Sequence, residues 1–153
     1  MKTILFICTG NIFRSMTAEH AFCAQIGNAP YCAESAGLTA DPQQMYPPVR
    51  DRIITLGIDP SAHQQRKLSL DMLNKADLSI AMGLDHCDYI RENFNREVLL
   101  FNRVALGKDE PIKDIWEIVP NWNTNEDSRR TYALYVVDTI WNTMPDFIHN
   151  MDR

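Results

Sequence analysis

A cysteine and an arginine six residues apart stand near the start of the chain, in the sequence CTGNIFRS that runs from Cys8 to Ser15. An apolar run typical of a buried strand precedes them, and residues 15–26 have the spacing of an amphipathic helix. A loop between a strand and a helix directs its backbone N–H groups and the helix N-terminus at one point, which favours a bound anion. The same field favours a cysteine thiolate, and a guanidinium suits phosphate oxygens. The Cys-x5-Arg spacing therefore predicts a phosphate site with a sulfur nucleophile.

The elements that must position this loop alternate along the chain. Patterns of apolar residues predict strands at 3–8, 31–35, 78–82 and 97–101, and helices at 15–26, 49–56, 69–76 and around 85–93. Residues 102–123 are expected to be irregular. A long last helix should begin at Thr124, with Asp127 completing a capping box, and Pro145 should kink or restart it. Such alternation predicts an α/β fold with a parallel sheet, and ligands bind at the carboxyl ends of its strands, where Cys8 stands.

Length, composition and charge narrow the class of protein. The 153 residues, 45% of them hydrophobic, are expected to form a single domain over residues 1–153. A net charge of −5 argues against nucleic acid as a partner, and no apolar run approaches the ~20 residues of a membrane helix. The four cysteines have no CxxC spacing and the histidines are scattered, so we expect reduced thiols, no metal site and a cytoplasmic protein.

The loop CTGNIFRS resembles the active-site loop of the low-molecular-weight protein tyrosine phosphatases, C-x-G-N-x-C-R-S. The resemblance extends to ESAG at 34–37, GIDPSAHQQR at 57–66, ADLSIAM at 76–82 and the acidic loop near Asp114. It implies a three-layer α/β fold with a four-stranded parallel sheet of order 2-1-3-4, flanked by helices. It also implies a cysteine-dependent phosphatase that hydrolyses phosphotyrosine monoesters through a thiophosphoryl-cysteine intermediate, without metal or cofactor.

The resemblance also implies a role for each residue of the loop. Cys8 would be the nucleophile, Arg14 the phosphate clamp, and Ser15 a hydrogen-bond donor to the thiolate. In this family the loop asparagine, here Asn11, has an unusual backbone conformation held by a serine and a histidine. The matching positions are Ser35 and His63, and an asparagine tolerates such left-handed geometry. The residues expected to surround the phosphate are Thr9, Gly10, Asn11, Ile12, Phe13, Arg14 and Ser15.

A general acid must protonate the departing phenolate. The family uses the aspartate of a D-P-[YW] loop before the last helix, and Asp114 with Trp116 is the best match in EPIKDIWEIVP. Ile115 stands in place of the proline. The remaining alternatives for the acid are Asp109, Glu110 and Glu117.

Two residues of the loop bear on substrate and redox chemistry. Ile12 stands where a phosphoarginine-hydrolysing subgroup carries threonine, and an aliphatic wall favours an aromatic ring. Ile12, Tyr46 and Trp116 should line the substrate pocket. Met45 is an alternative to Tyr46. Phe13 replaces the second loop cysteine of the family, which removes a protective disulfide and favours over-oxidation of Cys8.

Two rival interpretations remain. Thioredoxin-coupled arsenate reductases share the fold and the Cys-x5-Arg loop, but they need two further cysteines a few residues apart, and only Cys87 lies in the corresponding region. A phosphate-binding module without activity would lack the nucleophile, the clamp or the acid. The expected partner is a phosphotyrosine protein or another aryl phosphate, with no nucleic acid or membrane, and the chain should be a monomer or a weak homodimer.

Overall fold

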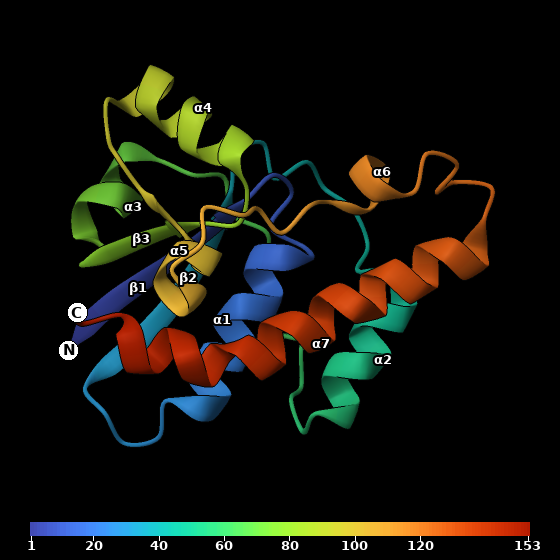
Figure 1. Ribbon diagram of the computed structural model, residues 1–153, viewed down its shortest axis with the longest axis horizontal. Coiled ribbons are helices and arrows are strands. Elements are labelled where there is room, and N and C mark those ends of the chain that lie inside the picture. Colours follow the sequence, from blue (N-terminus) through green and yellow to red (C-terminus); the bar gives the residue numbers. More distant parts are fainter.

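The computed structural model describes residues 1–153, which form one parallel sheet of four strands in the order β2-β1-β3-β4 (Figure 1). The strands are β1 (Lys2–Cys8), β2 (Tyr31–Gly37), β3 (Leu78–Ala81) and β4 (Leu99–Leu100). Both the fold class and the strand order predicted from the sequence are confirmed.

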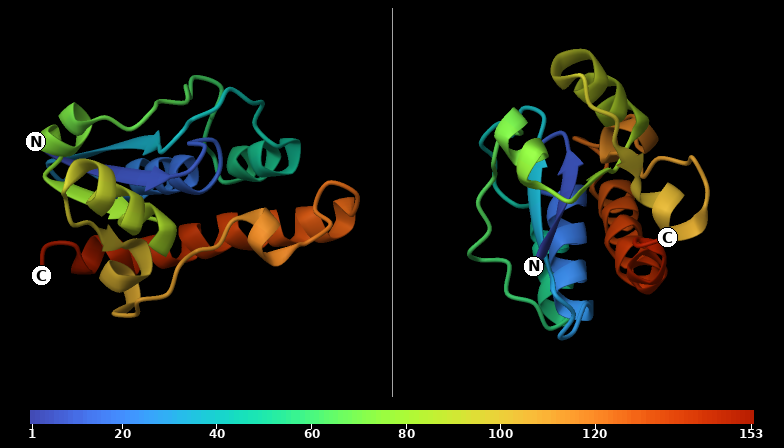
Figure 2. Two further views of the ribbon diagram at one scale, coloured as in Figure 1. Left: turned by 90° about the horizontal axis from the view of Figure 1, so that it is seen from above. Right: turned by 90° about the vertical axis from the view of Figure 1, so that its left-hand side faces the viewer.

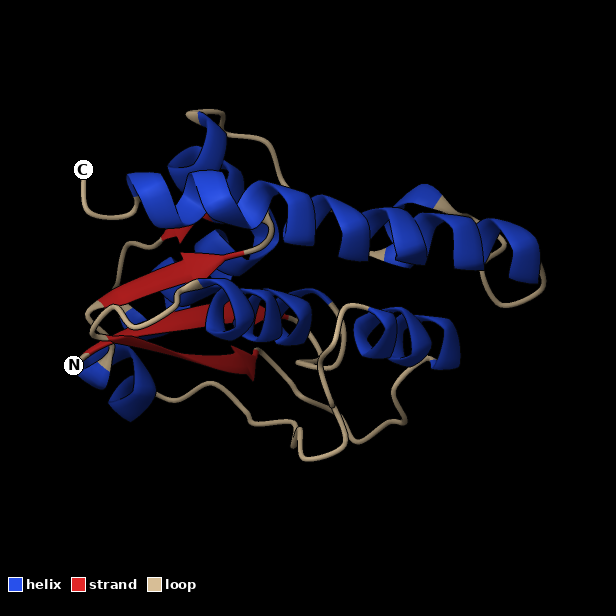
Figure 3. Ribbon diagram, turned by 90° about the horizontal axis from the view of Figure 1, so that it is seen from below, coloured by secondary structure: helices blue, strands red, loops and turns tan.

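Helices cover both faces of this sheet (Figures 2 and 3). Their bounds are α1 Arg14–Gln25, α2 Pro47–Thr55, α3 Leu70–Lys75, α4 Leu84–Phe94, α5 Phe101–Leu106, α6 Ile115–Ile118 and α7 Glu126–Asn150. Buried residues of α1, α5 and α7 pack on one face, and buried residues of α3 and α4 pack on the other. The N-terminal half of α7 continues past the sheet and packs on α1 and α2.

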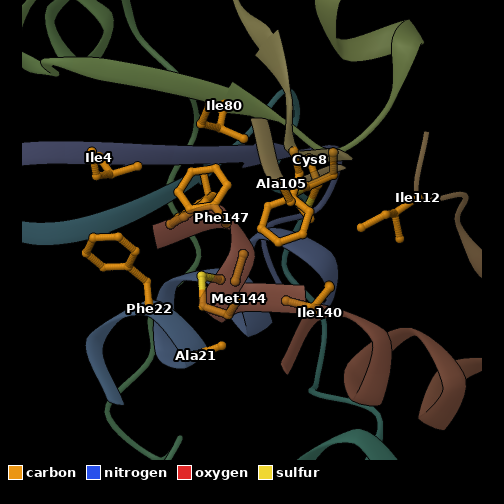
Figure 4. Close-up of a cluster of buried hydrophobic side chains, with 14 of the residues drawn as sticks. Ile4, Cys8, Ala21, Phe22, Ile80, Ala105, Ile112, Ile140, Met144 and Phe147 are labelled. Atoms are coloured by element: carbon orange, nitrogen blue, oxygen red, sulfur yellow. The ribbon is translucent and has the colours of Figure 1, made fainter. Parts of the chain in front are cut away.

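The central strand β1 is apolar because both of its faces are covered. Ile4, Phe6 and Cys8 point to the side of α1 and α7, whereas Leu5 and Ile7 point to the side of α3 and α4. This period of two, with both sets apolar, is typical of a strand in the middle of a parallel sheet. In Figure 4, Cys8 is at the end of β1 opposite to Ile4, on the side of Ile112. The nucleophile predicted from the sequence is thus anchored directly in the core.

The segment 97–123 differs from the expectation. The fourth strand has only two residues, because Phe101 already begins α5, where Phe101 and Ala105 bury the same face. The stretch expected to be irregular therefore contains α5 and the short α6. In a helix of six residues, only one pair of buried side chains shows the four-residue spacing. A pattern this short does not distinguish a helix from the end of a strand.

The last helix begins two residues later than expected. The side-chain oxygen of Asn125 accepts a hydrogen bond from the Ser128 N–H at 3.1 Å, so Asn125 is the N-cap and the predicted Thr124 capping box is wrong. Pro145 neither ends nor restarts α7, which runs to Asn150. Proline cannot donate to the carbonyl four residues earlier. The Gln25 side chain donates to that Trp141 carbonyl instead, at 3.1 Å. Although α7 has 25 residues, neither it nor any other helix has an apolar stretch sufficient to cross a membrane.

We expect Phe147→Ala to destabilise the fold strongly. The Phe147 ring is fully buried, stacks on Phe101 with ring centroids 5.1 Å apart, and contacts Phe6 at 5.5 Å. Truncating such a side chain costs about 3–5 kcal/mol, whereas truncating the exposed Tyr135 of the same helix should cost less than about 0.5 kcal/mol. Urea unfolding of the two variants measures the difference, and equal losses would contradict this view of the core.

Candidate active site

The phosphate loop, residues 8–15, joins the end of β1 to the first turn of α1. Cys8 is the last residue of the strand and is 2% exposed. Its Sγ lies 2.9 Å from Ser15 Oγ and 3.5 Å from the Ser15 backbone N. Ser15 Oγ accepts a hydrogen bond from the Asn11 amide at 3.0 Å, and its own proton can go to the sulfur, which is nearer than its other acceptor, the Ala36 carbonyl oxygen at 3.5 Å. This arrangement stabilises negative charge on Cys8.

Unpaired backbone donors line this loop. The N–H groups of Gly10 to Arg14 donate no hydrogen bond within the protein, and α1 begins without a side-chain cap. Free N–H groups at the beginning of a helix form an anion site, because their partial charges add to the helix dipole. The loop therefore provides a cradle for a tetrahedral oxyanion above the Cys8 sulfur.

Asn11 holds the loop in its shape. Its φ of 57° is left-handed, and its side chain is completely buried. The Asn11 amide donates to Ser35 Oγ at 2.8 Å, and its side-chain oxygen accepts from the Arg66 N–H at 2.8 Å. These bonds connect the loop to β2 and to the segment after α2. The two connections together hold the Asn11 backbone in its left-handed conformation.

His63 supports the same residue through its backbone. His63 Nε2 lies 2.7 Å from the Asn11 carbonyl oxygen, and a carbonyl can only accept, so Nε2 carries the proton. Burial lowers the pKa of His63 below its usual value, which favours the neutral ring. The structure thus brings both Ser35 and His63 to Asn11.

Arg14 and Asp114 meet at the rim of the site. The Arg14 side chain is buried, donates from Nη1 to the Ile112 carbonyl at 2.9 Å and lies 3.2 Å from Asp114 Oδ2 through Nη2. Asp114 is the N-cap of α6, where its other oxygen accepts the Ile115 N–H at 2.8 Å. Glu117, an alternative for the acid, accepts the Asp114 N–H at 2.6 Å and so has a structural partner.

A cavity of about 290 Å³ joins these groups. Cys8, Arg14 and Asp114 all line it, and so do the three residues predicted for the substrate pocket, Ile12, Tyr46 and Trp116. Thr9, Gly10 and Phe13 complete its floor. Met45 lines a neighbouring cavity instead, and neither Asp109 nor Glu110 borders the one that contains Cys8.

Sequence reasoning missed His86, which is fully buried on α4. Its Nδ1 accepts the Gly83 N–H at 2.9 Å, so Nε2 carries the proton and donates to Thr9 Oγ1 at 3.0 Å. Burial and the nearby Arg14 lower the pKa of His86 to about 4, which keeps the ring neutral. Thr9 and His86 are 77 residues apart and no local pattern connects them.

Trp122 and Arg129 were also missed, although both line the cavity. The Arg129 guanidinium lies 4.0 Å from the ring centre of Tyr46 and 5.3 Å from that of Trp122. Cation–π contacts of this kind hold two aromatic rings at fixed positions. They arise because the beginning of α7 packs beside the loop 37–47, which the sequence does not reveal.

A family model described as low molecular weight phosphotyrosine protein phosphatase matches residues 3–110. Among curated proteins, an arsenate reductase of Brevibacillus brevis is 36% identical over 115 residues, covering 75% of this chain and 81% of the relative. A probable low molecular weight protein-tyrosine-phosphatase, EpsP of Ralstonia solanacearum, is 31% identical over 87 residues, covering 54% of this chain and 57% of the relative. Among solved structures, the YwlE arginine phosphatase from Geobacillus stearothermophilus has a TM-score of 0.80 at 21% identity. The match covers 99% of this chain and 94% of that protein, and at this identity it shows a shared fold alone.

The fold and the loop define a cysteine-based phosphatase class. The chain belongs to the low molecular weight phosphotyrosine protein phosphatase family, because the family model matches more than two thirds of its length. The predicted family and enzyme class are therefore confirmed.

Gly37→Ala should damage the phosphate loop without unfolding the protein. A Cβ at Gly37 would lie 2.5 Å from the Thr9 carbonyl oxygen and 2.9 Å from the Asn11 N, both backbone atoms. The loop must shift, and a displacement of ~1 Å costs about 100-fold in rate. We expect kcat/KM for p-nitrophenyl phosphate to fall by about that factor. Gly107→Ala is the control, because its Cβ meets nothing within 4 Å and strains only the backbone at φ 71°; equal activity of the two variants would contradict the prediction.

Proposed function

We propose that this chain hydrolyses aryl phosphate monoesters, phosphotyrosine in proteins above all, with Cys8 as the nucleophile, Arg14 as the clamp and Asp114 as the acid. One observation carries the proposal: the buried Cys8 sulfur, the Arg14 guanidinium and the Asp114 carboxylate line one cavity above a loop of unpaired N–H groups. Asp41 also lines this cavity, but Asp114 is the carboxylate that pairs with Arg14, at 3.2 Å.

In the first step the Cys8 thiolate attacks phosphorus in line with the ester oxygen. The S–P bond forms as the P–O bond to the phenol breaks, and Asp114 gives its proton to the departing oxygen. The loop N–H groups and Arg14 hold the three remaining phosphate oxygens. Asp114 then takes a proton from water, which attacks phosphorus, and the thiolate leaves with its charge stabilised by Ser15.

The ion pair between Arg14 and Asp114 connects phosphate binding to the position of the acid. An incoming phosphate dianion competes with Asp114 for the Arg14 guanidinium, which lies 3.2 Å from the carboxylate before binding. Binding of the phosphate therefore releases the Asp114 carboxyl from Arg14 and leaves it free to turn toward the departing oxygen.

The walls of the cavity support an aromatic substrate. Ile12, Tyr46 and Trp116 border the space above the phosphate loop, together with Trp122. Aromatic and aliphatic walls of this kind stack on or flank a phenyl ring. A reducing compartment such as the cytoplasm suits an enzyme whose Cys8 must stay a thiolate and whose other cysteines are unpaired. We further propose a monomer or a weak homodimer.

Arsenate reduction is the second candidate, since several curated relatives carry that name. A disulfide relay needs two cysteines near Cys8. The free cysteines besides Cys8 are Cys23, Cys32 and Cys87, and the thiol of Cys87 points to the Val98 carbonyl at 3.8 Å. The chain therefore favours hydrolysis over the relay.

Replacing the nucleophile separates these two candidates. Cys8→Ser should abolish hydrolysis of p-nitrophenyl phosphate and of a phosphotyrosine peptide, because serine is not ionised at neutral pH. Cys87→Ser should keep wild-type activity. Thioredoxin-dependent arsenate reduction that requires Cys87 would overturn the assignment, and faster turnover of a phosphoarginine peptide than of phosphotyrosine would overturn the substrate class.

Replacing the acid tests the second role. Asp114→Asn should lower kcat for a phosphotyrosine peptide by about 10²–10³-fold, since proton donation contributes that much to such a step. The loss should be smaller for p-nitrophenyl phosphate, whose leaving group needs less protonation. The matched control is Asp109→Asn, an exposed carboxylate of the same segment that pairs with Arg103 at 3.7 Å. A larger loss in Asp109→Asn would move the acid to that residue.

A further inference from the structure

Behind the phosphate loop, on the side away from Cys8, three metal-ligating side chains converge. Glu19 and His20 come from α1, and His63 comes from the segment after α2. One ligand atom of each lies within 4.8 Å of the other two. None of the three lines the cavity that contains Cys8, so the proposed phosphatase chemistry leaves this cluster without a role as a group.

Two of these side chains face one another without a proton donor between them. His63 Nε2–H is used on the Asn11 carbonyl, so the opposite ring nitrogen, Nδ1, carries a lone pair. That Nδ1 lies 3.9 Å from Glu19 Oε2, which is too long for a hydrogen bond. Two electron-pair donors at this distance can share one cation, and a metal ion is the cation that can bind both at once.

The third side chain has an unused nitrogen. His20 Nε2 is buried and has no hydrogen-bond partner, and the His20 ring meets the His63 ring edge-on with centroids 6.0 Å apart. Buried polar atoms without a partner are rare and call for an explanation such as a bound ion. The cluster therefore offers an unused imidazole nitrogen beside the His63 ring.

We propose that Glu19, His20 and His63 bind a divalent transition-metal ion, Zn²⁺ by preference. Two imidazoles and one carboxylate, with water as the fourth ligand, form a common zinc set. Bonds of 2.0–2.1 Å place tetrahedral ligand atoms about 3.4 Å apart. Closing the cluster from its present separations requires a movement of ~1 Å, which the Glu19 side chain, 21% exposed, can supply by rotation.

The bond from His63 to Asn11 is what a metal-ligating histidine needs. Such histidines donate their second ring N–H to a carboxylate or a backbone carbonyl, which fixes the tautomer and the ring. Here that carbonyl belongs to Asn11, the left-handed residue of the phosphate loop, at 2.7 Å. An ion at Nδ1 would hold His63 in the tautomer that supports the loop, so metal binding stabilises the loop from behind and leaves the Cys8 sulfur free.

Zinc titration tests this site without relying on enzyme activity. Isothermal calorimetry of the Cys8→Ser chain, which removes the nucleophile as a competing ligand, should give one saturable Zn²⁺ site. His20→Ala in that background should weaken the affinity by about tenfold or more, while His149→Ala, an exposed histidine of α7, should bind as before. In imidazole NMR spectra, the signals of His20 and His63 should shift with Zn²⁺, and those of His86 and His149 should not.

Three results would overturn the proposal: no saturable binding, equal binding by His20→Ala, or a cobalt spectrum with an intense sulfur-to-metal band. The last would move the ion to a cysteine such as Cys23 or Cys32. Circular dichroism checks that His20→Ala is folded, and Glu19→Gln is the second variant, which keeps the shape of the side chain and removes its charge. Loss of the Zn²⁺ site in a folded variant supports the proposal.

Discussion

The left-handed turn at Asn11 is the constraint on which the site depends. A residue with a side chain adopts φ 57° at a steric cost, and it stays there only when its surroundings hold it. Ser35, Arg66 and His63 do so through the Asn11 side chain and carbonyl. Because the turn is held, the following N–H groups stay unpaired and available to an anion, and Ser15 stays next to the Cys8 sulfur.

The rest of the fold brings distant segments to that turn. Cys8 belongs at once to the core cluster and to the cavity, so the packing of β1 against α1 and α7 determines where the sulfur lies. Arg14 connects the first helix to residues about 100 positions later, through the Ile112 carbonyl and the Asp114 carboxylate. The clamp and the acid that we propose therefore meet in one ion pair, and a charged ligand at Arg14 also affects Asp114.

The comparisons with known proteins show why the loop alone does not name a substrate. Relatives described as arsenate reductases and a relative described as a probable tyrosine phosphatase both match this chain. In our proposal, the features that favour hydrolysis lie outside the loop: the aromatic walls of the cavity, Asp114, and the positions of the other three cysteines. The metal site proposed behind the loop would act on neither substrate directly, since it reaches the reaction only through His63 and Asn11.

The sequence by itself determined the features that depend on local pattern. A buried strand, a short loop and a helix predicted an oxyanion site at Cys8 and Arg14. The apolar runs predicted the parallel α/β sheet that the structure contains, because periodicity and spacing are properties of neighbouring residues. The boundaries of α5 and α7 were less predictable, since packing and a cap at Asn125 decided them.

Only the tertiary structure brought His86 to Thr9, Arg129 to Tyr46, and Glu19 and His20 to His63. Histidines that are scattered along the chain gave no sign of a metal site, because contacts between residues tens of positions apart arise from the fold and leave no trace in local spacing.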